Sequence, residues 1–241
     1  MIAHFFTVLL YVPIYNLLIF LVDIIPGGDI GLAVIIVTII IKLAIAPLTI
    51  SSLRTSRAMQ ALQPKMKEIQ EKYKEDKEVQ AKETFALYKK YKLNPFASVF
   101  ALFIQLPVII ALYYVFRHEA VAFDPTVLYS FVHAPAAISA NFLGFFALTT
   151  HNSILAVIAA ATQYLQARYA MPVPPAVKDA SASEQLNRSL AIQTRYLLPL
   201  FIGFIAYVSS GAIALYFITT ALFTLAQELY MRRLPKFVLE A

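Results

Sequence analysis

The stretch from Gly31 to Ile50 reads GLAVIIVTIIIKLAIAPLTI, and it decides the class of the protein. It is apolar apart from Thr38, Lys42 and Thr49. A membrane-spanning helix needs about 20 such residues, because each adds about 1.5 Å toward roughly 30 Å of hydrocarbon. The stretch therefore predicts a transmembrane helix.

The composition of the whole chain supports this prediction. Of its 241 residues, 60% are hydrophobic and only 14% are charged, whereas a typical soluble domain has about 25% charged residues. A single soluble core cannot hide so much apolar surface. The composition therefore excludes an ordinary soluble enzyme, a disordered chain and a nucleic-acid-binding module. The lack of cysteine excludes a disulfide framework and a thiolate metal site.

Five segments are apolar and long enough to span a bilayer, so the sequence predicts an all-α polytopic membrane protein. These spans are residues 31–50, 96–116 and 153–170, with two more inside 196–230. The triplet Ser209-Ser210-Gly211 separates the last two, so we expect them to form an antiparallel hairpin. The other predicted parts are an N-terminal helix and turn (1–30), a cytoplasmic helical hairpin (51–95), an extracytoplasmic loop (117–152), a cytoplasmic loop (171–195) and a cytoplasmic tail (231–241).

Residues 2–25 fit two interpretations. The segment is long enough to be a sixth span, although Pro13 interrupts it. It also fits a helix lying in the membrane interface, with Tyr11, Tyr15 and Asn16 near the lipid headgroups. The residues alone leave both interpretations open.

The distribution of Lys and Arg predicts the orientation. Residues 51–95 contain eleven of the twenty basic residues, residues 168–195 contain four, and the tail after Tyr230 contains three. These segments alternate correctly for one side of the membrane, and cytoplasmic loops are the ones that retain Lys and Arg. We therefore expect a cytoplasmic C-terminus, and we attribute the basic charge to topology and anionic lipid contact rather than nucleic acid.

An apolar heptad spacing predicts that residues 51–95 form two helices projecting into the cytoplasm. The spacing runs through Met59, Met66 and Tyr73 and resumes around Phe85, after a break near Asp76. Flexible apolar side chains of this kind adapt to varied partners. We therefore expect Met59, Met66, Tyr73 and Phe85 to offer adaptable apolar contacts on this hairpin.

Lys42 is the costly feature of the first span, since a central lysine costs roughly 2.5–3.5 kcal/mol on insertion scales. One explanation is that its stem snorkels to the cytoplasmic headgroups. We favour a water-filled cavity open to the cytoplasm, because Lys42 lies nearly three turns from Arg54 and the five spans contain no acid except Glu228. The polar residues that fit the walls of such a cavity are Thr38, Gln105, Gln163, Thr219 and Thr220.

An ordered set of motifs resembles the YidC/Oxa/Alb family of membrane insertases. In IIVTIIIKLAIAPLT at 35–49, Lys42 takes the place where the family usually has arginine. The other motifs are MQALQPK at 59–65, LYKKYKLNP at 87–95, FIQLP at 103–107, ALYY at 111–114, and SG at 210–211 followed by LY at 215–216. Each motif alone is weak, but the ordered set covers most of residues 31–233.

The resemblance implies five spans around a hydrophilic groove that is open to cytoplasm and lipid and closed outside. It implies an insertase and chaperone of the bacterial inner membrane, acting on nascent membrane proteins alone or beside the Sec translocon. It favours an interfacial helix before the first span. By position, Lys42 is the groove cation, Thr38 and Gln105 lie beside it, and Tyr216 with Phe217 is the aromatic pair of the last span. Membrane lipids and the ribosome are further implied partners, although the short basic tail argues against strong ribosome docking.

The expected mechanism is binding without bond chemistry. The sequence contains no P-loop, no His-Glu-x-x-His and no Gly-x-Ser-x-Gly motif, so we expect no enzyme activity, no cofactor and no metal. A small-solute transporter or channel is the alternative, since it would also use an intramembrane lysine. Such proteins are typically built from inverted repeats, and the sequence has no visible internal repeat.

Overall fold

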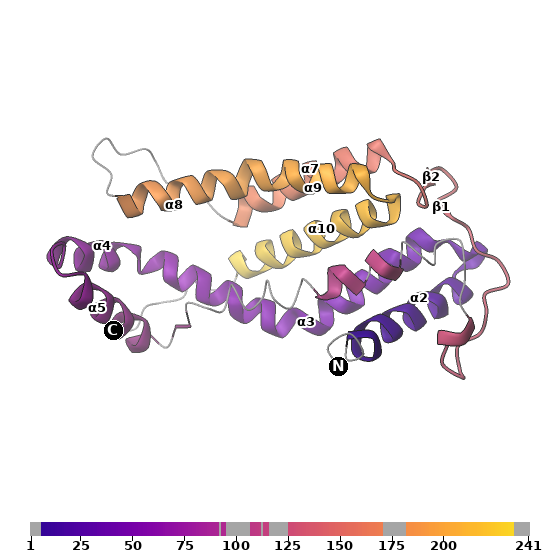
Figure 1. The fold of residues 1–241 in the computed structure, drawn as a ribbon, viewed down its shortest axis with the longest axis horizontal. Helices are drawn as coiled ribbons and strands as arrows, with labels where there is room; N and C mark the ends of the chain where they lie inside the picture. Colours follow the sequence, from indigo (N-terminus) through magenta and orange to yellow (C-terminus); the bar gives the residue numbers. More distant parts are fainter. Residues whose placement is uncertain are drawn as a thin grey trace. The chain divides into compact units, whose positions relative to one another are not determined.

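The computed structural model describes residues 6–91, 93–94, 107–111, 113–115, 125–170 and 182–233. The chain divides into two compact units. The first contains residues 1–43 and 107–229, and the second contains residues 44–106 and 230–241. The long helix α3 (Ile30–Ala61) begins in the first unit and ends in the second (Figure 1).

Four helical stretches among the described residues are long and apolar enough to cross a membrane. They are Thr7–Ile24, Ile30–Met59, Arg188–Val208 and Gly211–Arg233. The helix α7 (Ser153–Ala170) is shorter, and polar residues enter its second half. Residues 96–106, which form half of the predicted second span, lie outside the described residues. The prediction of a mostly helical, multi-pass membrane protein is therefore confirmed, whereas the full set of five spans stays a prediction.

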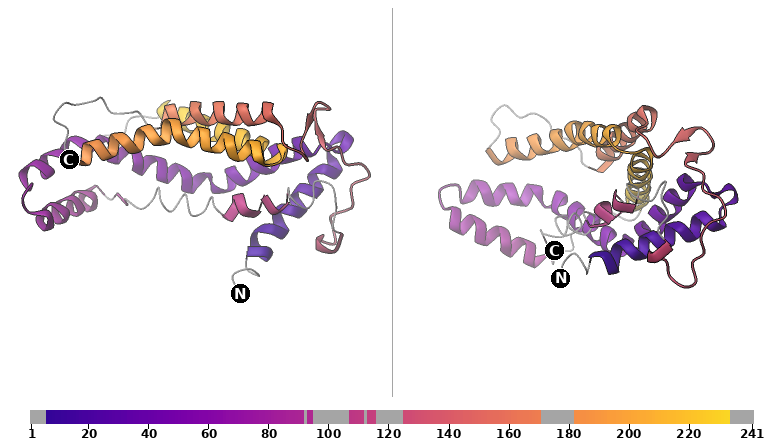
Figure 2. Two further views of the ribbon diagram at one scale, coloured as in Figure 1. Left: turned by 45° about the horizontal axis from the view of Figure 1, so that its top comes forward. Right: turned by 45° about the vertical axis from the view of Figure 1, so that its right-hand side comes forward.

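The first unit has one continuous apolar core formed by several helices. It draws on α2 (Val12–Ile24), the first half of α3, α7, α9 (Leu198–Val208), α10 (Gly211–Arg233) and the helical residues 107–111 and 113–115. α10 is the most buried of these, since every residue from Gly211 to Thr219 is buried. Figures 1 and 2 show α7 lying along α9. Gly203 of α9 permits this close packing, because a Cβ at that position would collide with the Cβ of Ala160.

Two prolines explain short π-helical turns in otherwise continuous helices. Proline has no N–H and its ring clashes with the carbonyl four residues earlier, which a wider turn relieves. The turn η1 (Thr7–Tyr11) precedes Pro13 at the start of α2. The turn η4 (Gln193–Leu197) likewise joins α8 (Ala182–Ile192) to α9, where Pro199 occupies the first turn.

The N-terminal helix α2 packs into the core rather than presenting its polar residues to lipid headgroups. Tyr15 and Asn16 are both buried, and the choice between a spanning and an interfacial helix for residues 2–25 stays a prediction. The side-chain amide of Asn16 donates to the carbonyl of Val127 at 3.0 Å and accepts from the N–H of Tyr129 at 2.6 Å. The residue thus satisfies the backbone of a loop that follows η3 (Pro125–Val127).

A short β-hairpin, absent from the all-α prediction, lies where α3 and α10 begin. Its strands are β1 (Asn141–Phe142) and β2 (Phe146–Ala147), with Phe142 paired to Phe146. Strands of two residues have no detectable alternation, and the Leu143-Gly144 turn lacks the usual Asn-Gly signal. The turn η2 (Pro26–Gly28) meets this region, since the N–H of Ser139 donates to the Gly28 carbonyl at 2.8 Å.

The second unit contains a pair of helices, α4 (Gln63–Lys72) and α5 (Lys77–Lys90). Pro64 lies in the first turn of α4, where its missing N–H costs nothing. Asp76 caps α5 by accepting the N–H of Val79 at 3.0 Å. The two helices are joined by the bond between the Tyr88 hydroxyl and the Met66 sulfur at 3.5 Å.

Candidate functional site

Lys42 and Thr38 lie on one buried stripe of α3, which Val34 also occupies. The three residues are spaced by four, so they lie on the same face of the helix. Lys42 is only 7% exposed. The Thr38 hydroxyl donates to the Val34 carbonyl at 2.6 Å and so satisfies itself within the helix. The structure therefore places the predicted cation inside the protein rather than on its lipid-facing surface.

The polar residues predicted on α10 follow its aromatic pair. Tyr216 and Phe217 are buried, with ring centroids 5.5 Å apart. The Thr219 hydroxyl donates to the Leu215 carbonyl at 2.8 Å, while the buried hydroxyl oxygen of Thr220 has no hydrogen-bond partner among the described residues. About two turns beyond Thr220, Glu228 is also buried, which the sequence analysis did not anticipate.

The β-hairpin region gives α3 and α10 a common starting level. The N–H of Leu143 donates to Asp29 directly before α3, and the N–H groups of Gly211 and Ala212 donate to the carbonyls of Thr150 and Leu148. Because each helical residue rises about 1.5 Å, depth along both helices can be counted from this level.

Counted this way, the polar side chains of both helices begin at the same depth. Thr38 and Thr219 each lie eight residues into their helices, or about 12 Å deep. Lys42 lies about 18 Å deep and Glu228 about 26 Å deep. The first eight residues of both helices, 30–37 and 211–218, are apolar apart from Tyr216. An apolar layer therefore separates the β-hairpin region from a polar layer deeper in the unit.

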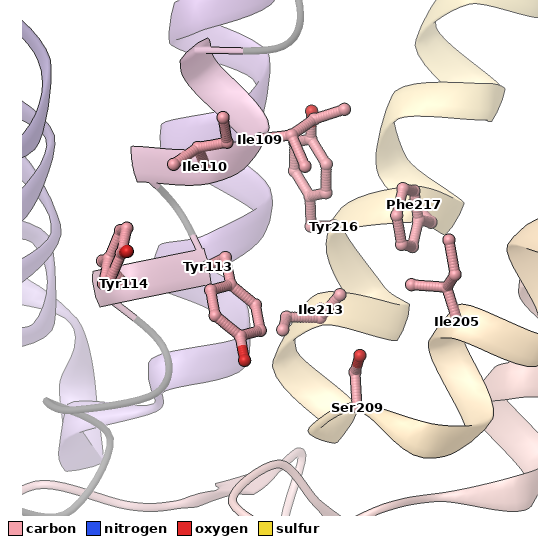
Figure 3. Close-up of a pocket in the computed structure, with 9 residues that line it drawn as sticks. All are labelled: Ile109, Ile110, Tyr113, Tyr114, Ile205, Ser209, Ile213, Tyr216 and Phe217. Atoms are coloured by element: carbon pink, nitrogen blue, oxygen red, sulfur yellow. The ribbon is translucent and has the colours of Figure 1, made fainter. Parts of the chain in front are cut away.

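An apolar pocket of about 440 Å³ opens between residues 109–114 and the α9–α10 turn (Figure 3). Among the predicted site residues, Tyr216 lines it, and Lys42, Thr38, Thr219 and Thr220 do not. Its other lining residues are Ile109, Ile110, Tyr113, Tyr114, Ile205, Ser209, Ile213 and Phe217. The sequence analysis found Tyr113, Tyr114, Ser209 and Phe217 in the family motifs or the turn but assigned them no pocket, because the pocket joins segments about a hundred residues apart.

The two predicted glutamines differ in outcome. Gln163 is half-buried on α7 and donates to Gln166 at 2.9 Å, so its amide is engaged along its own helix. Gln105 lies outside the described residues.

The predicted contacts of the cytoplasmic hairpin divide into two groups. Met59, Met66 and Tyr73 are half-buried, whereas Phe85 is 60% exposed and lies outside the seam between α4 and α5. The heptad pattern does not reveal this, because it gives the spacing of apolar residues and not the exposure of each side chain. Phe85 is therefore the predicted contact that is most accessible.

Two hairpin tyrosines have opposite electrostatic environments. The ammonium of Lys65 donates to the Tyr91 hydroxyl at 2.6 Å, and this bond lowers the pKa of Tyr91. Burial raises the pKa of Tyr88, because a buried phenolate loses its hydration. Lys65 and Lys90 also lie 5.1 and 5.8 Å from the Tyr91 ring centroid, so a cationic cluster surrounds this residue.

Comparison with known proteins shows the family of this chain. Residues 20–237 match the family described as 60Kd inner membrane protein. The chain belongs to this family. Its predicted resemblance to the YidC/Oxa/Alb insertases is thereby confirmed, and the match covers α3, the hairpin, the pocket and α10.

Relatives in the family share about a third of their residues with this chain. It is 33% identical over 211 residues to the membrane protein insertase YidC of Clostridium tetani, covering 88% of this chain and 85% of the relative. It is 30% identical over 235 residues to the membrane protein insertase MisCA of Bacillus subtilis, covering 95% of this chain and 80% of the relative.

A solved structure, an active YidC insertase crystal structure with the first transmembrane domain resolved, has a similar fold. The TM-score is 0.53 and the sequence identity 22%. The match covers 83% of this chain and 41% of that chain. The family is therefore shown by sequence, and the helical fold is shown by structure.

Proposed function

We propose that this chain is a membrane protein insertase and chaperone that moves short hydrophilic client segments through a polar intramembrane region and releases client helices into lipid. Its place in the family supports the proposal, together with the two relatives that carry the insertase name over most of both chains. The four helices long enough to span a bilayer agree with a multi-pass membrane protein.

The layering along α3 and α10 supports a pathway that is closed at one end. A client backbone in bare hydrocarbon leaves polar groups unpaired, at a cost of several kcal/mol each. Thr38, Lys42, Thr219 and Thr220 offer polar partners about 12–18 Å below the β-hairpin. The apolar layer above them closes that end, so the polar region opens in the opposite direction.

The distribution of Lys and Arg indicates that the open end of the polar region faces the cytoplasm. Residues 51–95 and the tail carry fourteen Lys and Arg, and positive loops remain inside. In this orientation the C-terminus is cytoplasmic, the β-hairpin is extracytoplasmic, and the bacterial inner membrane is the compartment.

Lys42 supplies the charge that attracts acidic client residues. It is a buried cation, twelve residues or about 18 Å along α3 from its first residue. In our proposal its ammonium binds a client carboxylate transiently, with no bond made or broken. The drive comes from apolar partition of the client and from the membrane potential acting on its acidic residues.

The pocket in Figure 3 is the proposed docking place of a client's apolar helix. Its lining of isoleucine and tyrosine side chains fits an apolar helix face, and its position beside the α9–α10 turn leaves the helix free to enter lipid. The cytoplasmic hairpin acts earlier, with Phe85 and the half-buried methionines as first contacts. The Sec translocon and the ribosome are proposed partners of these early steps.

The pure protein in liposomes tests the proposal. A single-span client is added, and protease protection reports the fraction that inserts. We expect insertion above the level of empty liposomes. Solute flux without client insertion would instead support the transporter alternative and overturn the insertase.

A further inference from the structure

The cap of the first unit, residues 125–152, has an unusual composition for a segment outside the long helices. It contains no Asp, Glu, Lys or Arg in 28 residues, and five of them are Phe or Tyr. A loop that lies in water is normally polar or charged, because nothing else compensates exposed apolar area. The cap therefore does not have the composition of a water-exposed loop.

The β-hairpin of the cap is fixed rigidly on its inner side. Phe142 packs on Gly31, where a Cβ would overlap its ring, and it lies 6.3 Å from the ring of Phe146. Asp29 accepts the Leu143 N–H at 2.8 Å. These contacts hold the hairpin at the beginning of α3, and Ala147 and Leu148 meet the first residue of α10 in the same way.

The outer side of the hairpin presents large apolar side chains. Leu143 and Phe145 belong to the turn that joins the two strands. Leu143 is 53% exposed and Phe145 is 87% exposed. Leu143 has φ +53°, which favours Gly or Asn, yet the turn presents a leucine there. Other exposed apolar residues of the cap are Tyr129, Phe131 and Ile138.

We propose that the Leu143–Phe145 tip inserts into the interfacial region of the bilayer leaflet at this end of the bundle and anchors the cap to lipid. The observations select lipid as the occupant in three ways. The cap contains no Asp, Glu, Lys or Arg, its hairpin is held against the first residues of α3 by the contacts of Asp29 and Gly31, and its tip exposes Leu143 and Phe145. Aromatic side chains are the residues that favour this depth.

The inference needs only the membrane embedding of the helices, so it holds or fails independently of insertase activity. A second protein seated on the tip is the competing occupant, and the test below separates the two.

The chain has no tryptophan, so one substitution gives an unambiguous fluorescent probe. Phe145→Trp is tolerated sterically, because the side chain is almost fully exposed. In liposomes of the pure protein, we expect its emission to be blue-shifted. We expect lipids brominated near the glycerol end of the acyl chain to quench it more than lipids brominated near the chain end.

Two further tryptophan probes give the quenching expected in the hydrocarbon core and in water. Leu200→Trp lies on an exposed apolar face of α9, about 12 Å from its end, and should be quenched most by chain-end bromine. Glu75→Trp lies in the exposed turn between α4 and α5 and should show red-shifted emission without quenching. Phe131→Trp, on another exposed part of the cap, repeats the test if Phe145→Trp does not fold.

Red-shifted, unquenched emission at position 145 in the pure proteoliposome would overturn the proposal. So would strongest quenching by chain-end bromine, which would place the tip in the hydrocarbon core. A blue shift that requires an added protein would assign the tip to a protein partner and also overturn the lipid anchor.

Discussion

The N–H of Leu143 donates to Asp29, which lies 114 positions earlier in the chain, with 2.8 Å between nitrogen and Oδ2. The other carboxylate oxygen of Asp29 accepts the N–H groups of Gly31 at 2.7 Å and Leu32 at 3.1 Å. One side chain thus caps the first turn of α3 and fixes the hairpin turn, and the helix dipole favours its negative charge.

Asp29→Ala should therefore destabilise the protein by about 2 kcal/mol, since it removes a helix cap and leaves the Leu143 N–H without its acceptor. Asp29→Asn should lose less, because one amide oxygen still caps the helix. The measurement is the apparent Tm in one detergent. Asp23→Ala, which removes an exposed acid from the same region, should leave the Tm almost unchanged.

Gly28 and Gly27 offer a second comparison on the same turn. Both have positive φ, so alanine is strained at either position by about 1 kcal/mol. A Cβ at Gly28 would also overlap the carbonyl oxygen of Ala137, whereas a Cβ at Gly27 would meet open space. We expect Gly28→Ala to lower the Tm several times more than Gly27→Ala. Equal losses would show that the cap does not pack on this turn.

Tyr91 and Tyr88 of the α4–α5 hairpin should have pKa values on opposite sides of that of ordinary tyrosine. The Tyr91 pKa should be lower than that of ordinary tyrosine because of the Lys65 bond, and the Tyr88 pKa should be higher because of burial. Tyrosine labelled with carbon-13 at Cζ reports each pKa by NMR in the whole protein, with Tyr88→Phe and Tyr91→Phe giving the assignments. Lys65→Met should return the Tyr91 pKa toward 10.

The sign of the stability change follows from proton linkage. The folded hairpin releases the Tyr91 proton earlier than the unfolded chain, so this group adds stability as pH rises through its folded pKa. The gain is complete above the unfolded value near 10 and is lost as pH falls through the folded pKa. Tyr88 acts oppositely, and its contribution is lost as pH rises through its raised pKa. If the stability difference between the wild-type protein and Tyr91→Phe does not change as pH rises toward about 10, the result would contradict the Lys65 bond.

What the sequence predicted well depends on local pattern. Apolar length predicts α3 and α10, and the Ser209-Ser210-Gly211 triplet falls between α9 and α10. The heptad spacing places Met66 beside α5, where Tyr88 contacts its sulfur. Each of these features follows from residues a few turns apart.

What it missed depends on contacts between distant segments. The pocket needs Ile109 and Ile213 to meet, and Asn16 is buried because it bonds the backbone of Val127 and Tyr129. The β-hairpin is held by Asp29 and Gly31 rather than by strand propensity. Helical periodicity carries no information on such long-range partners.

The charge of Lys42 gives the last prediction. If the ammonium attracts acidic client residues, Lys42→Arg should retain insertion and Lys42→Ala should impair it for clients with acidic translocated segments. One charge pair about 4 Å apart gives roughly 4 kcal/mol at an effective dielectric of about 20. Desolvation opposes most of this, so the net loss should be about 1–2 kcal/mol, or about tenfold in the insertion equilibrium. Clients with neutral segments should lose less.

The control is Arg54→Ala, which removes the same charge from an exposed position on α3 and should leave both clients unaffected. Protease protection in liposomes measures each case, and equal losses for acidic and neutral clients would show that Lys42 acts through the structure of α3 rather than through its charge.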